Sequence, residues 1–254
     1  MMENSKAKIV RYILLLLVIV ELYAEFVHDR GLMFFTKPFV LPLIAVYYFL
    51  SVNGTWSKLH KLMMFAFLFS WFGDVSLMLT PETPADTSLM GIPKSPYCFL
   101  AGLGSFLVTQ ILFISAFRRA VSVSGGSGIL FSKLYYVPFL IYWVSILCIV
   151  LPPLQHNAEK QIVTVPVIVY AAVLISMAAT AFSRRGKTNS QSFWLTFAGA
   201  CIFVISDSLI ALNFLALPQP GFYAGFSIMS TYVIAEYLIA EGVLSHENSS
   251  FAVN

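Results

Sequence analysis

Eight long apolar stretches, separated by short polar connections, account for most of the chain. Each is close to the roughly 20 residues that an α-helix needs to cross a bilayer. The pattern therefore predicts an all-α protein, a polytopic membrane helix bundle with eight transmembrane helices. The predicted spans are residues 9–27, 36–52, 60–80, 97–117, 132–151, 161–182, 192–216 and 222–244.

The connections carry residues that break helices. "TPETPADTSLMGIPKSP" (Thr80 to Pro96) is the longest and is rich in proline, and "VSVSGGSG" (Val121 to Gly128) is a glycine/serine linker. Neither is long enough to fold as a soluble domain, so residues 1–254 are expected to form a single transmembrane domain. The first stretch is too long for a signal peptide and lacks a small-residue cleavage site, so it is expected to be retained.

Composition agrees with this reading. The 254 residues are 59% hydrophobic and only 11% charged, whereas a soluble domain carries about 25% charged residues. The net charge is +3, and no basic patch interleaved with aromatic residues indicates a nucleic-acid partner. The three scattered cysteines predict neither a disulfide framework nor a zinc site, and the four histidines fall at span ends or outside them.

Lysine and arginine residues are distributed unequally between the two sides of the predicted bundle. Cytoplasmic loops collect these residues. Eleven lie on the side of the N-terminus and four on the opposite side. The eleven are Lys6, Lys8, Arg11, Lys58, Lys61, Arg118, Arg119, Lys133, Arg184, Arg185 and Lys187; the four are Arg30, Lys37, Lys94 and Lys160. Both termini are therefore expected in the cytoplasm, which requires an even number of spans.

Several ionisable residues fall inside the apolar stretches, where they are costly and tend to be functional. Glu21 and Glu25 lie one turn apart in the first span, and Glu236 lies in the eighth. Lys37 opens the predicted second span, followed by Pro38, which suits a first helical turn.

Two aspartates are expected to meet in the non-cytoplasmic half of the bundle. At 1.5 Å per residue, Asp74 lies roughly 20 Å and Asp207 roughly 24 Å from the cytoplasmic edge. Lys37 enters from the same outer side, and Glu236 lies deeper, as a floor. Two helical stripes support a polar pocket there, namely Gly199, Phe203, Asp207 and Ala211, and Tyr232, Glu236 and Ala240. Gln110, Tyr142, Tyr170 and Asn213 are the nearby polar and aromatic candidates. Tyrosines such as Tyr142 and Tyr170 more often serve packing than chemistry, and Asn213 can alternatively cap a helix or bond backbone.

Several motifs resemble one family. "TKP" (Thr36 to Pro38), "FGD" (Phe72 to Asp74), "GACIFVISDSLIALNFL" (Gly199 to Leu215) and "IMSTYVIAEYLIA" (Ile228 to Ala240) are similar to the YhhN/lysoplasmalogenase family of membrane proteins. The resemblance implies hydrolysis of the vinyl ether bond of lysoplasmalogens to a fatty aldehyde and a glycerophospho-ethanolamine or -choline. The matching polar residues are Lys37, Asp74, Asp207, Asn213 and Tyr232.

Three positions depart from the family pattern. Gln110 stands where relatives often have histidine, Phe113 where they often have tyrosine, and Glu236 where they often have glutamine. If that histidine takes part in proton transfer, Glu236 is a candidate for supplying the missing group. These departures bear on the substrate more than on the location of the site.

An enol ether is hydrolysed when an acid protonates its outer vinyl carbon and water attacks the resulting oxocarbenium ion. Two carboxylates in different environments suit this chemistry, by analogy with glycosidases. Asp207, expected to be deeper and ringed by apolar residues, is assigned as the general acid. Asp74, expected closer to water and to Lys37, is assigned as the ionised partner, although the two roles can be exchanged. The expected substrate-binding residues are Lys37, Gln110, Tyr170, Asn213, Tyr232 and Glu236.

Lys37 can alternatively hold the substrate phosphate, and the scheme requires no cofactor. The expected partners are a lysophospholipid substrate and the bilayer itself. A bacterial inner membrane is the favoured location, and the endoplasmic reticulum membrane fits a eukaryotic chain.

Two other functions fit the composition. One is a small transporter with a proton relay of Glu21, Glu25, Asp207 and Glu236, although the two halves of the chain show no repeat of the kind common in transporters. The other is a non-catalytic lipid-binding protein.

Overall fold

The chain is a bundle of long helices. The computed structural model describes residues 4–52, 56–81, 88–95, 97–123, 133–156, 161–217 and 220–251. Its α-helices are α1 (Ser5–Val27), α2 (Arg30–Ser51), α3 (Lys58–Met78), α4 (Tyr97–Val123), α5 (Val137–His156), α6 (Thr164–Phe182), α7 (Ser190–Ile210) and α8 (Ala224–Phe251). Every predicted span overlaps one of these helices, which confirms the all-α class.

Short elements complete the described part. The 3-10 helices η1 (Lys133–Tyr136) and η2 (Gln161–Val163) precede α5 and α6, and the π-helix η3 (Ala211–Ala216) extends α7. The proline-rich connection contains a hairpin that the sequence did not predict, in which β1 (Ser88–Leu89) pairs antiparallel with β2 (Ile92–Pro93). Residues 124–128 of the glycine/serine linker lie outside the described residues.

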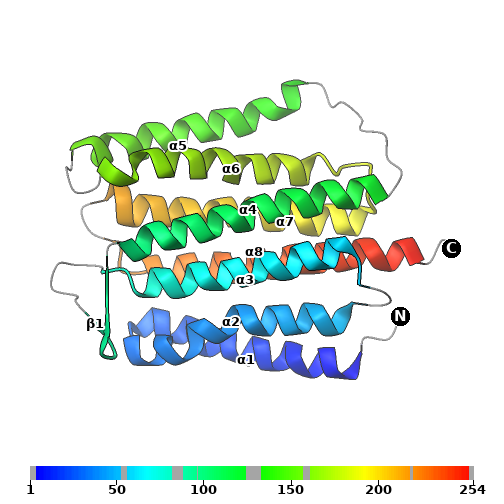
Figure 1. Cartoon of the computed structure of the whole chain (residues 1–254), viewed down its shortest axis with the longest axis horizontal. Helices are drawn as coiled ribbons and strands as arrows, with labels where there is room; N and C mark the ends of the chain where they lie inside the picture. Colours follow the sequence, from blue (N-terminus) through cyan, green and yellow to red (C-terminus); the bar gives the residue numbers. More distant parts are fainter. Residues whose placement is uncertain are drawn as a thin grey trace.

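The helices are stacked from one edge of the bundle to the other (Figure 1). α1 and α2 form one edge, α5 and α6 form the opposite edge, and α3, α4, α7 and α8 lie between them. The main packing pairs include α7 with α8, α3 with α4, α1 with α2, and α4 with α6. The N-terminal end of α1 and the C-terminal end of α8 lie at the same end of the bundle.

Seven helices in the described ranges are long and apolar enough to cross a membrane. They are Arg30–Ser51, Lys58–Met78, Tyr97–Val121, Leu134–His156, Gln161–Phe182, Ser190–Ala216 and Ala224–His246. The chain is therefore a multi-pass membrane protein. α1 is not in this group and contains five charged residues, Lys6, Lys8, Arg11, Glu21 and Glu25, so the eighth span remains a prediction.

α1 nevertheless turns its two acidic side chains into the bundle and not toward the outer surface. Glu21 is fully buried and Glu25 is 7% exposed, whereas Leu16, Ile19 and Tyr23 are each more than half exposed. A helix that turns carboxylates inward and large apolar side chains outward is arranged as a lipid-facing helix is.

α2 begins earlier than the sequence predicts. The Asp29 side chain caps the helix by accepting a hydrogen bond from the backbone N–H of Leu32 at 3.0 Å. Pro38 therefore lies inside α2 and the expectation that it occupies the first turn is wrong. Lys37 consequently lies about 10 Å along the helix from its start. Membrane helices tolerate internal proline because neighbours satisfy freed backbone groups, and here the Trp71 indole N–H donates to the Pro38 carbonyl at 2.8 Å.

One cation assigned to a loop is buried. Arg184, in the turn between α6 and α7, is fully buried, and its guanidinium donates to the hydroxyls of Ser192, at 2.7 Å, and Thr196. It also lies 5.5 Å from the centroid of the Phe117 ring on α4. Burial lowers the pKa of Arg184 to about 10, which still leaves it charged at neutral pH. This end of the bundle is therefore fixed by a buried guanidinium.

The α7–α8 contact depends on glycine. A Cβ added to Gly199 would lie 2.9 Å from both the Ala235 carbonyl oxygen and the Ile239 Cγ1 atom. The small-residue stripe predicted on α7 is thus in close contact with α8, as small residues in membrane helices allow.

Gly199→Ala should lower the free energy of unfolding by about 1–3 kcal/mol, because α7 and α8 must move apart to admit the methyl group. Thermal unfolding of the purified protein in detergent measures the change. Gly104→Ala on α4 is the matched control, because nothing lies within 4 Å of the added Cβ there. Equal effects at both positions would contradict the packing argument.

Candidate functional site

An apolar cavity lies between α4, α5, α6 and α7, in the half of the bundle away from the termini. The empty space between these helices, including the part open to the outside, is about 740 Å³. Apolar residues from several helices form its walls, among them Phe99, Leu103, Ile146, Leu174 and Leu215. Its polar residues are Tyr142, Tyr170, Asp207 and Ser208. The cavity thus suits a long apolar molecule with one polar region.

Asp207 is held at the cavity wall by a tyrosine. The Tyr170 hydroxyl on α6 donates to Asp207 Oδ2 at 2.5 Å. The next residue of α7 is held similarly, since the hydroxyls of Tyr142 on α5 and Ser208 are 2.8 Å apart. Two adjacent polar residues of α7 are therefore tied to two neighbouring helices where the cavity is polar.

Asp74 is the second buried aspartate. The Tyr232 hydroxyl on α8 donates to Asp74 Oδ2 at 3.0 Å, and the Tyr232 ring packs edge-on against Phe106 and Phe203. Asp74 is not among the residues that form the cavity wall, but it is near enough to Asp207 for their charges to interact. The two aspartates thus occupy one polar region, each with its own tyrosine.

The relative exposure of the two aspartates is the reverse of the expectation. Asp74 is only 5% exposed, whereas Asp207 is half-buried. The reason is the cavity, which opens beside Asp207 and which counting residues along a helix cannot detect. The apolar ring expected around Asp207 is present as the cavity walls.

Glu236 lies beside Asp74 in the interior. Glu236 is fully buried, and its Oε1 atom accepts a hydrogen bond from Ser70 at 2.7 Å, with Thr109 in turn 3.3 Å from Ser70. The charge of Glu236 is near enough to interact with both aspartates. Gln110, the residue after Thr109, is also fully buried and lies next to Tyr170.

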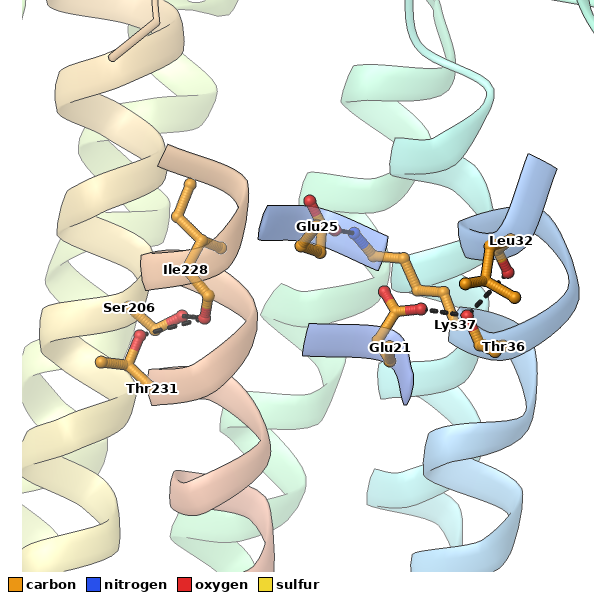
Figure 2. Close-up of polar contacts among 8 residues, drawn as sticks. All are labelled: Glu21, Glu25, Leu32, Thr36, Lys37, Ser206, Ile228 and Thr231. Carbon is orange, nitrogen blue, oxygen red and sulfur yellow. Dashed lines mark hydrogen bonds and ion pairs between the residues drawn. The ribbon is translucent and has the colours of Figure 1, made fainter. Parts of the chain in front are cut away.

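Lys37 belongs to a second polar group at the α1–α2 edge of the bundle (Figure 2). Its ammonium forms an ion pair with Glu25 at 2.9 Å. The Thr36 hydroxyl is bonded to Glu21 and to the carbonyl oxygen of Leu32. The expected proximity of Lys37 and Asp74 takes the form of a charge interaction, while the ion pair is made with Glu25.

Glu25 is seated against α8 as well. A Cβ added to Gly225 would overlap Glu25 Oε2, so the carboxylate packs directly against the α8 backbone at this glycine. The Lys37–Glu25 pair therefore connects three helices, α1, α2 and α8.

Other motif residues hold backbone in place. The Asn213 side chain donates to the Leu209 carbonyl at 2.8 Å and accepts from the Gly221 N–H at 2.9 Å. Ser206 on α7 and Thr231 on α8 both donate to the Ile228 carbonyl oxygen (Figure 2). These side chains fix the α7–η3–α8 connection.

Sequence reasoning missed two residues of this region. Ser208 and Thr109 were not assigned because serine and threonine in apolar helices usually bond to the carbonyl four residues earlier. Both do so here, to Val204 and Ser105, as well as to the groups above. Their position next to the assigned residues Asp207 and Gln110 was the available signal. Within the described ranges, no group of three or more histidine, cysteine, aspartate or glutamate side chains is placed to hold a metal ion.

Comparison with known proteins gives similarity to several curated relatives. The chain is 29% identical over 158 residues to proteins named lysoplasmalogenase from Mycobacterium bovis and Mycobacterium tuberculosis, covering 61% of this chain and 54% of each relative. It is 30% identical over 152 residues to human lysoplasmalogenase TMEM86A, covering 56% of this chain and 54% of the relative. The aligned part thus spans about half the length of these relatives.

No solved structure matches the chain. A family model does match, and it covers residues 32–243. That range begins at the first turn of α2 and includes Lys37, both aspartates, Tyr232 and Glu236, and it ends near the C-terminal end of α8. On this evidence the chain belongs to the YhhN family.

Proposed function

We propose that the protein is a membrane-embedded hydrolase that cleaves the vinyl ether bond of lysoplasmalogen-type lipids. The observation that carries the proposal is the position of Asp207, on the wall of an apolar cavity and within charge interaction of Asp74. Support also comes from the printed names of the relatives, which describe lysoplasmalogenases. The products are a fatty aldehyde and a glycerophospho-head group.

In this proposal Asp207 is the general acid. Its carboxyl proton goes to the outer vinyl carbon, which leaves an oxocarbenium ion at the carbon bonded to the ether oxygen. One water molecule attacks that carbon and returns a proton to the Asp207 carboxylate. The hemiacetal then breaks its bond to the glycerol oxygen, which takes the hydroxyl proton, and the aldehyde leaves. The sum is one vinyl ether and one water giving one aldehyde and one alcohol.

Asp74 serves as the ionised partner in the same proposal. A negative charge in a water-excluded site stabilises a developing cation more strongly than it would in water. The Lys37 ammonium is near enough to Asp74 for their charges to interact, and this attraction offsets part of the cost of burying an ionised Asp74. The reverse assignment, with Asp74 as the acid and Asp207 as the ionised partner, gives the same overall reaction.

The remaining polar residues position the substrate. The alkenyl chain lies in the cavity between α4, α5, α6 and α7, with Tyr170 orienting Asp207. Tyr232 orients Asp74, and Lys37 holds the phosphate when a substrate displaces its partner. Asn213 contributes by fixing the backbone after α7.

We also propose that all eight helices span the membrane with both termini in the cytoplasm. Support comes from the inward glutamates and outward apolar side chains of α1, and from the common end at which α1 begins and α8 ends. Single cysteines placed in a variant lacking Cys98, Cys148 and Cys201 report the side of each connection by labelling with a membrane-impermeant maleimide. Labelling of the two ends of α1 from the same side would contradict eight spans.

Purified protein in detergent should release aldehyde from a lysoplasmalogen. A coupled aldehyde dehydrogenase, which converts each aldehyde into one reduced nicotinamide, follows the reaction continuously. A saturated ether lysolipid, which has no vinyl bond to protonate, is the matched control and should give no signal. Absence of aldehyde together with proton-coupled lipid uptake in liposomes would instead support the transporter, which the buried acids Glu21 and Glu236 would serve.

A further inference from the structure

We propose that Gln110 and Glu236 are specificity-determining residues that bind the free hydroxyl on the central glycerol carbon of a lysolipid. This inference rests on the proposed function, because it places a lysolipid chain in the α4–α7 cavity. It goes further by assigning two residues to the one functional group that separates a lysolipid from a two-chain lipid.

The first observation is a set of buried polar atoms without partners. Gln110 Nε2, Gln110 Oε1 and Glu236 Oε2 make no hydrogen bond to any described residue, although both side chains are fully buried. Buried polar side chains nearly always have partners, since an unpaired one is costly. Two such side chains together indicate a place built to receive a polar group.

The second observation is where these atoms lie. Tyr170, whose ring lines the cavity and whose hydroxyl is bonded to Asp207, lies next to the Gln110 amide and near Glu236. Ser70 and Thr109 connect the same two residues, because Ser70 is bonded to Glu236 and lies 3.3 Å from Thr109, which precedes Gln110. Gln110 and Glu236 are not among the residues that line the cavity, but both lie beside Tyr170, which lines it and is bonded to the proposed acid.

The third observation is chemical complementarity. A hydroxyl both donates and accepts one hydrogen bond, and these two side chains offer an N–H donor in Gln110 and a carboxyl acceptor in Glu236. In a vinyl ether lysolipid the central hydroxyl is three bonds from the ether oxygen, so a lipid whose vinyl group meets Asp207 carries its hydroxyl into this region. A two-chain lipid has an ester at that carbon, which offers no donor and leaves Glu236 Oε2 unpaired.

The hydroxyl should therefore contribute strongly to recognition. A site built to bond a substrate hydroxyl discriminates against the analogue that lacks it much more than an apolar pocket discriminates between chain lengths. We expect the protein to prefer the hydroxyl-bearing lysolipid over the analogue with hydrogen in its place by about tenfold or more in kcat/KM.

The test crosses two substrates with two variants. The substrates are a vinyl ether lysolipid and its analogue lacking the central hydroxyl, and the variants are Gln110→Leu and Glu236→Gln. Each variant should reduce kcat/KM for the hydroxyl substrate about tenfold more than it reduces kcat/KM for the analogue, so that the preference between the two substrates is lost. Gln191→Leu, at an exposed position of α7, is the matched control and should retain the full preference.

A binding measurement separates this inference from the proposed function. Saturated ether lysolipids with and without the hydroxyl report affinity with no chemistry, by calorimetry in detergent. Tighter binding of the hydroxyl form, lost in Gln110→Leu, supports the inference even if no vinyl ether is cleaved. Equal binding of the two lipids by the unaltered protein, or an equal loss on both substrates in each variant, overturns it. Absence of aldehyde from every vinyl ether, with the binding preference intact, contradicts the proposed hydrolysis alone.

Discussion

Asp207→Asn should lower aldehyde release by about 1,000-fold or more, because an amide at the cavity wall has no acidic proton to give to the vinyl carbon. The same substitution keeps the size of the side chain, and asparagine can still accept the hydrogen bond that Tyr170 donates. Folding in detergent should therefore be retained. The measurement is the single-turnover rate with the protein in saturating excess over lysoplasmalogen.

Asp74→Asn tests the partner role in the same assay. It removes the charge that stabilises the oxocarbenium ion, so a loss of comparable size is expected. Asp29→Asn is the matched control for both variants. Asp29 caps α2 from an exposed position, and asparagine is an equally good helix cap, so activity should be unchanged. Full activity in either aspartate variant of the interior would refute the paired-acid scheme.

Closing the cavity should have the next largest effect. Ala171 on α6 lines the cavity, and Ala171→Phe fills space that the proposed alkenyl chain needs. We expect kcat/KM for a long-chain lysoplasmalogen to fall by about 100-fold, since apolar pockets discriminate to that extent when their volume changes. A short-chain vinyl ether should lose much less, because it needs less of the cavity.

The decisive measurement is the ratio of kcat/KM for the long-chain substrate to kcat/KM for the short-chain substrate. Val169→Phe, on the same helix but 46% exposed and outside the cavity wall, should leave both rates unchanged. A uniform loss for long and short chains in Ala171→Phe would indicate damage to the helix packing instead. A full long-chain rate would show that the chain binds elsewhere.

Much of the polar site could be predicted from the sequence, because a charged or polar residue within an apolar stretch is easily recognised. Asp74, Asp207, Glu236 and Gln110 are all found in the interior, as their sequence setting indicates. The hydrogen-bond partners of these residues were harder to predict. Tyr170 donates a hydrogen bond to Asp207, and Tyr232 donates one to Asp74. This pairing depends on how α6 and α8 are rotated about their axes, and the local sequence pattern does not contain that rotation.

Two expectations failed for related reasons. The second span was predicted to start at residue 36, whereas the Asp29 cap starts the helix at Arg30. The order of burial of the aspartates was inferred from residue counts, whereas the cavity beside α7 exposes Asp207 more than Asp74. In both cases an interaction absent from the hydrophobic pattern decided the outcome.

The sequence by itself determined the helical class, the apolar stretches and which acids must be withdrawn from lipid, because hydrophobicity and its spacing are properties of each segment alone. The tertiary structure alone decided that Lys37 pairs with Glu25, that Asp207 meets a cavity, and that Gln110 and Glu236 keep polar atoms unpartnered among the described residues. Those outcomes depend on how side chains from different helices fill the same space, and the depth and rotation of each helix are fixed only when all of them pack together.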